Sequence, residues 1–69
     1  MKQIVNVDDI CVKGTETVSE FKRVLIEKWI YQNFRDVKIK HYDEYTILTD
    51  KKGGQMKITY KAGKLELEY

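Results

Sequence analysis

The chain has 69 residues, of which 42% are hydrophobic and 35% are charged, and its formal net charge is +2. This length fits a single domain covering residues 1–69, and the composition excludes a disordered chain. The small net charge gives no electrostatic reason to expect an anionic membrane surface or a dedicated DNA-binding domain.

The first predicted elements lie before residue 15. Residues 2–7 alternate loosely and are rich in β-branched side chains, which indicates a short strand. Residues 8–9 indicate a turn, and residues 10–13 are an optional second strand that would close a hairpin. The chain has neither an apolar run of the roughly 20 residues that cross a bilayer nor the apolar segment of a signal peptide. We therefore expect a soluble cytoplasmic protein, and the single cysteine, Cys11, agrees with a reducing compartment.

The clearest pattern is a helix of about five turns. Thr17 and Glu20 have the spacing of a capping box, in which both side chains satisfy free backbone N–H groups, and Thr15 is a rival cap. The apolar residues that recur at helical spacing in one stripe are Val18, Phe21, Leu25 and Trp29. The helix is expected to end near residue 34 or 35.

Four strands are predicted after the helix, and each alternates between apolar and polar side chains. They cover residues 37–42, 45–49, 55–60 and 65–69. Short turns connect them, including a glycine pair at residues 53–54, which accepts the positive φ angles of hairpin turns. The pattern is typical of an antiparallel meander.

The alternation also assigns side chains to the two faces of the sheet. The apolar face is predicted to contain Val37, Ile39, Ile47, Met56, Ile58, Tyr60, Leu65 and Leu67. The opposite face is predicted to contain Lys38, Lys40, Tyr42, Thr46, Lys57, Thr59, Glu66 and Glu68. Because the helix is the only long amphipathic element, we expect it to cover the apolar face. The predicted fold is thus α+β, with one long helix packed on one face of an antiparallel sheet, in the order strand, optional strand, helix and four strands.

Ile26, Ile30 and Phe34 form a second apolar line on the helix, away from the first stripe. Two interpretations are open. Either the N-terminal strand or hairpin folds over this line and buries it, or part of the line is exposed and docks another protein together with Tyr31. The second interpretation predicts a small non-enzymatic protein-interaction module, comparable in size to regulators and to inhibitors carried by phages or mobile elements. Its partner would be another protein or, as the simplest assembly, a second copy in a homodimer. A sheet edge that is open to strand addition is the alternative surface for such an interaction.

The alternative function is nucleic-acid binding by the polar face of the sheet. Lysines with an interleaved aromatic residue can follow a phosphate backbone and stack on a base. The residues concerned are Lys38, Lys40, Tyr42 and Lys57. The same residues are also typical of a solvated sheet face, and Glu66 and Glu68 on a neighbouring strand weaken the basic character.

No catalytic residue, metal site or cofactor is predicted. His41 is the only histidine, and no set of nucleophile, base and oxyanion donors surrounds it. Cys11 lacks a CxxC partner, so we expect it to be a small buried hydrophobe. One thiol and one imidazole are too few for a closed zinc site, which takes four ligands. The acidic pairs at residues 8–9 and 43–44 are interpreted as turn formers, and we expect no enzymatic activity.

Overall fold

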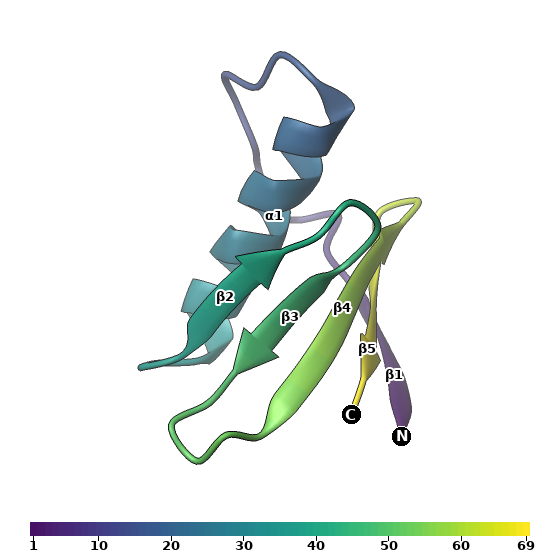
Figure 1. Cartoon of the computed structure of the whole chain (residues 1–69). Coiled ribbons are helices and arrows are strands. Elements are labelled where there is room, and N and C mark those ends of the chain that lie inside the picture. The colour runs from purple at the N-terminus through teal and green to yellow at the C-terminus, as the bar shows by residue number, and fades with distance from the viewer.

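The computed structural model describes residues 1–69 and contains one helix and five strands (Figure 1). In chain order these are β1 (Lys2–Asn6), α1 (Val18–Asn33), β2 (Lys38–His41), β3 (Thr46–Thr49), β4 (Gln55–Lys61) and β5 (Lys64–Glu68). The predicted order of one strand, a helix and four strands is confirmed. The optional strand over residues 10–13 does not form, and Ile10 and Val12 of that segment instead pack against the core.

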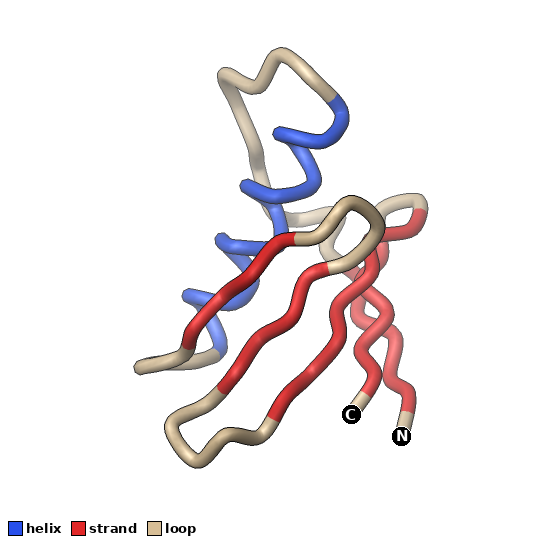
Figure 2. Tube along the Cα trace, in the orientation of Figure 1, coloured by secondary structure: helices blue, strands red, loops and turns tan.

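All five strands belong to one antiparallel sheet with the order β1-β5-β4-β3-β2. Strands β2 to β5 follow one another as hairpins, and β1 lies beside β5, so β1 and β2 form the two edges of the sheet. Figure 2 shows the helix on one side of the strands only. The fold therefore has two layers, and nothing covers the second face of the sheet.

The start of α1 follows from its capping residues. The Oγ1 atom of Thr17 accepts a hydrogen bond from the Glu20 N–H at 3.1 Å, as the sequence predicts. The Glu20 carboxylate accepts from the N–H of Glu16 at 3.0 Å, one residue before the N–H that a standard capping box would use. The helix ends at Asn33 and is neither long nor apolar enough to cross a membrane.

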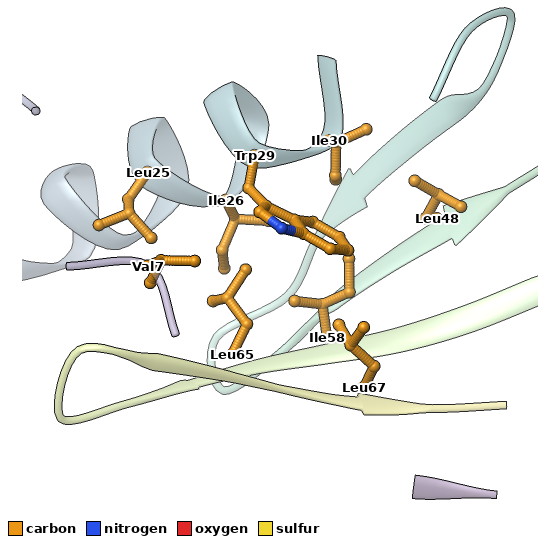
Figure 3. Close-up of a cluster of buried hydrophobic side chains, with 9 residues drawn as sticks. All are labelled: Val7, Leu25, Ile26, Trp29, Ile30, Leu48, Ile58, Leu65 and Leu67. Carbon is orange, nitrogen blue, oxygen red and sulfur yellow. The ribbon is translucent and has the colours of Figure 1, made fainter. Parts of the chain in front are cut away.

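The core lies between α1 and the facing side of the sheet (Figure 3). Its buried hydrophobic members are Val7, Leu25, Ile26, Trp29, Ile30, Leu48, Ile58, Leu65 and Leu67. Figure 3 shows the Trp29 ring reaching from the helix toward Ile58 in the middle of the cluster. Val7, which directly follows β1, lies near Leu25 and Leu65 at one end. Residues from both ends of the chain and from the helix thus build one cluster.

Two residues of β3 lie on the face opposite to the one predicted. Thr46 faces the helix and is 2% exposed, whereas Ile47 faces outward. The register explains this difference, because Thr46 lies opposite Ile58 and Leu48 lies opposite Met56, and opposed residues share a face. Ile47 and Leu48 are consecutive apolar residues, so alternation alone allows either assignment. The other members of the predicted apolar face belong to the core or pack against it.

The turn between β4 and β5 has an unusual residue in its first central position. Ala62 and Gly63 have φ angles of 47° and 80°, between the paired residues Lys61 and Lys64. Two-residue hairpin turns with positive φ at both central residues favour Asn-Gly, because the Cβ atom of alanine is sterically unfavourable in the left-handed region. A Cβ atom at Gly63 would also meet the Asp8 carboxylate, so a larger residue there would have to displace that side chain.

Replacing Ala62 by asparagine is therefore expected to stabilise the protein. Asparagine tolerates the left-handed conformation, so Ala62→Asn should raise the free energy of unfolding by about 0.5–1 kcal/mol. Urea unfolding followed by circular dichroism measures this change. The β-branched control Ala62→Val should lower stability, and equal stability of the two variants would contradict the turn geometry.

Removing one methyl group from the centre of the core should be costly. Ile30 is 0% exposed, so Ile30→Val is expected to reduce the free energy of unfolding by about 0.5–1.5 kcal/mol. The control is Val18→Ala on the same helix, where the side chain is 70% exposed. The control should change stability by less than about 0.5 kcal/mol, although it removes more carbon. The midpoints of urea denaturation of the two variants decide between these outcomes.

Candidate functional site

The helix residues predicted as a protein interface lie mostly in the core. Ile26 and Ile30 are 4% and 0% exposed, and half-buried Phe34 packs edge-on against Trp29 with ring centroids 5.7 Å apart. The hypothesis of an exposed docking line is therefore wrong for Ile26 and Ile30, and the interpretation that they are core residues is confirmed. Tyr31, which is 68% exposed, is the member of that set that stays freely accessible.

The helix buries a wide arc because two parts of the chain pack against it. Sheet residues such as Ile58 cover one side. Val7 and the half-buried Ile10 and Val12, from the segment that joins β1 to α1, also pack into this core. The N-terminal region thus contributes to the covering of the helix, as one interpretation proposed, but it does so with an irregular segment instead of a hairpin.

The face of the sheet away from α1 is open, and we call it the outer face. Opposed residues of neighbouring strands share a face, so the registers arrange its side chains in rows. One row across the five strands is Lys40, Ile47, Lys57, Glu68 and Lys2. The next row is Tyr42, Tyr45, Thr59, Glu66 and Ile4. The predicted residues Lys38, Lys40, Tyr42 and Lys57 therefore share this face.

Four of these side chains form what we call the Lys–Tyr cluster: Lys40, Tyr42, Tyr45 and Lys57. The rings of Tyr42 and Tyr45 are stacked, with centroids 4.9 Å apart and an interplanar angle of 23°. The Nζ atom of Lys40 lies 5.3 Å from the Tyr42 centroid, and that of Lys57 lies 4.8 Å from the Tyr45 centroid. Both distances are in the range of cation–π interactions. The cluster thus combines two positive charges with two aromatic rings.

Tyr45 is the member of the cluster that the prediction of the site did not include. It lies opposite Tyr42, whose N–H donates to the Tyr45 carbonyl at 2.8 Å across the two-residue turn. A signal for this pairing is present in the sequence, because a two-residue turn at residues 43–44 places residues 42 and 45 side by side. Turn length, combined with face assignment, would have identified the tyrosine pair.

The β1–β5 half of the outer face is occupied by ion pairs. Glu66 lies 3.4 Å from Lys2 and 3.3 Å from Lys61, and Lys2 also lies 3.4 Å from Glu68. Hydrogen bonds from Lys61 and then Lys2 hold the pKa of Glu66 below its usual value of 4.5. The glutamates in turn raise the pKa of Lys2. The charges of this half are therefore matched within the chain, whereas Lys38, Lys40 and Lys57 make no ion pair.

Two open depressions lie on either side of the β2–β3 turn. One, of about 220 Å³, lies between α1 and the turn and is lined by Lys22, Arg23 and Tyr42 among others. The other, of about 410 Å³, lies over the outer face, where Lys57 and Thr59 line it together with the carboxylates of Glu44, Glu66 and Glu68. Tyr45 lines both. Three members of the Lys–Tyr cluster, Tyr42, Tyr45 and Lys57, thus line these depressions.

His41 faces the helix and links it to the sheet. Its Nδ1 atom lies 2.8 Å from the Thr46 hydroxyl, and its Nε2 atom lies 3.4 Å from a Glu27 carboxylate oxygen on α1. Its nearest carboxylate is therefore on the helix, and not at residues 43–44.

Cys11 is exposed, so the expectation of a buried cysteine is wrong. Its backbone carbonyl accepts a hydrogen bond from the Lys28 ammonium at 2.7 Å. Cys11 lies in the irregular segment between β1 and α1, where Ile10 and Val12 on either side of it pack against the core. No group of three histidine, cysteine, aspartate or glutamate side chains lies close enough together to hold a metal ion.

Comparisons of this chain with protein-family models, with curated proteins and with solved structures find no match. The chain is thus described by its architecture, an α+β domain with one helix on a five-stranded sheet, and by the open outer face.

Acid should remove the stabilising effect of Glu66. Because its pKa is lowered in the folded state, its ionised form stabilises the fold above the usual pKa, and this contribution is lost as the pH falls through the folded-state pKa. We expect Glu66→Gln to be less stable than the natural chain at neutral pH, and the difference to shrink toward zero in acid. Urea unfolding at a series of pH values measures this difference.

The control for this measurement is Glu44→Gln, which changes an exposed turn glutamate that makes no ion pair. Its effect on stability should be small at every pH. A constant difference between the natural chain and Glu66→Gln from neutral pH to acid would contradict the ion-pair assignment.

Proposed function

We propose that this chain is a non-enzymatic nucleic-acid-binding module that holds a single strand on the outer face of its sheet, at the Lys–Tyr cluster. The observation that carries the proposal is the pairing of two stacked tyrosines with two lysines that have no acidic partner. Single-stranded nucleic acid offers the matching chemistry, since it has phosphates for the lysines and flat bases for the rings.

The charges of the outer face favour one side of the sheet for the strand. Lys38, Lys40 and Lys57 lie on β2 and β4 without an ion pair, so they are free to bind phosphates. On β5, Glu66 and Glu68 bind Lys2 and Lys61, so these two lysines are not free to bind phosphates as Lys38, Lys40 and Lys57 are. A bound strand is therefore expected to follow β2, β3 and β4 and to leave β5 and β1 unoccupied.

The energies of the contacts allow a base to replace a lysine over a tyrosine ring. An exposed cation–π contact contributes about 0.5–1 kcal/mol, whereas stacking of a base on an aromatic side chain contributes about 1–3 kcal/mol. Lys40 and Lys57 have long flexible side chains that can move from the rings to adjacent phosphates. Binding would then use the same four residues, with the bases on Tyr42 and Tyr45.

The protein-interaction function predicted from the helix stays a prediction, but it no longer has the surface on which it was based. Ile26 and Ile30 are inaccessible in the folded chain. We also propose a cytoplasmic location. The exposed Cys11 has a free thiol, which supports this location because unpaired cysteines are typical of reducing compartments.

Fluorescence anisotropy with a labelled oligothymidylate of about 12 nucleotides, a length within the site sizes of small domains that bind single strands, tests the proposal. Binding should weaken with salt, with a log–log slope of about −2 if three lysines neutralise phosphates. The double variant Lys40→Gln/Lys57→Gln should bind at least about tenfold more weakly, and Tyr42→Leu should lose about 1 kcal/mol or more of stacking energy.

Matched controls change the same residue types elsewhere. Lys13→Gln/Lys64→Gln removes the same charge, and Tyr31→Leu removes an exposed tyrosine from the helix. Both controls should bind like the natural chain. The absence of binding at low salt, or equal losses in the cluster variants and their controls, would overturn the proposal. Equal binding of polyaspartate would show recognition of charge alone, and it would also contradict the proposed role of stacking.

A further inference from the structure

The free edge of β1 has backbone groups that point away from the sheet. In antiparallel pairs, hydrogen-bonded residues alternate along each strand. On β1, the Val7 N–H donates to Gly63 at 3.1 Å and the Met1 carbonyl accepts from Tyr69 at 3.0 Å, so the odd-numbered residues bond to the β5 side. The residues whose amides point away from the sheet are Lys2, Ile4 and Asn6.

The side chain in the middle of this edge is apolar and exposed. Ile4 is 67% exposed on the outer face, at the end of the row that crosses the sheet through Glu66. An exposed isoleucine on an edge strand combines free backbone groups with an apolar contact, which is the combination that favours strand addition.

The two edges of the sheet differ in their protection against strand addition. On β2, Lys38 and Lys40 lie on the outer face, one on each side of Ile39 in the sequence. If two β2 strands paired antiparallel and symmetrically about Ile39, Lys38 of each copy would lie opposite Lys40 of the other. On β1 the only lysine is Lys2, and Glu66 and Glu68 bind its ammonium group. The β2 edge is therefore protected by charge, whereas the β1 edge is not.

We propose that two copies of this chain pair through their β1 edges in an antiparallel, symmetric arrangement centred on Ile4. In this register Ile4 of each copy lies opposite Ile4 of the other, and Lys2 lies opposite Asn6. Each pair is compatible in charge, since no lysine faces a lysine. The free amides of Lys2, Ile4 and Asn6 gain carbonyl partners, and the two isoleucines cover each other. Symmetric pairs of this kind are the commonest assembly of identical chains.

This pairing does not depend on nucleic-acid binding, because it uses the opposite edge of the sheet from the Lys–Tyr cluster. The two sheets would become one continuous sheet, with a cluster near each end. The β3 strands of the two copies would be about 34 Å apart at the usual strand spacing.

Analytical ultracentrifugation over a range of protein concentrations tests the proposal. The natural chain should shift from a monomer of 8.2 kDa to a dimer as its concentration rises. Ile4→Lys should raise the dimer dissociation constant at least about tenfold, because it places two positive charges opposite each other at the centre of the interface. The mutated position is exposed, so the monomer should keep its fold, as circular dichroism would verify.

The control variant is Val18→Lys, which makes a similar change at a residue of α1 that is 70% exposed. It should dimerise like the natural chain. Amide hydrogen exchange adds a site-specific result: the Ile4 and Asn6 amides should exchange more slowly as concentration rises, while those of Ile39 and His41 on the β2 edge should not change. A chain that stays monomeric at high concentration would falsify the proposal, and so would a dimer that tolerates Ile4→Lys.

Discussion

The structure depends on one packing contact, between the wide apolar arc of α1 and the facing side of the sheet. The 16-residue helix is about 24 Å long at its usual rise per residue, and five strands at the usual spacing are about 19 Å across. One helix therefore has enough surface for one face of the sheet, with Trp29 in the middle of the contact and Ile30 fully buried in it. The other face has no element to cover it and is exposed.

Most of the fold could be predicted from the sequence, because local patterns determine most of it. The Thr17 cap and the alternation of apolar and polar residues in the four strands after the helix predict the ends of these elements to within one or two residues. The β3 register could not be predicted, because Ile47 and Leu48 are adjacent and only the pairing with β4 decides which one faces the helix. The irregular segment at residues 10–13 is a similar case, since Ile10 and Val12 pack into the core without joining the sheet.

The candidate site was predicted only in part. Lys38, Lys40, Tyr42 and Lys57 share a face because alternation is a local property of strands. The burial of Ile26 and Ile30 was not determined by local pattern, because it depends on covering residues that are distant in sequence, such as Val7 and Ile58. A helix with apolar residues around much of its circumference is compatible with a large core or an interface, and only the tertiary arrangement distinguishes them.

The two ends of the chain are hydrogen-bonded neighbours. The Met1 ammonium group donates to the Tyr69 carbonyl at 2.6 Å, and the Tyr69 N–H donates to the Met1 carbonyl at 3.0 Å. Figure 1 shows both ends together at one corner of the molecule. Adjacent ends tolerate circular permutation and insertion into other domains. The domain is thus suited to grafting into a surface loop of a host protein, where separation of the two attachment points would disrupt the outermost strand pair first.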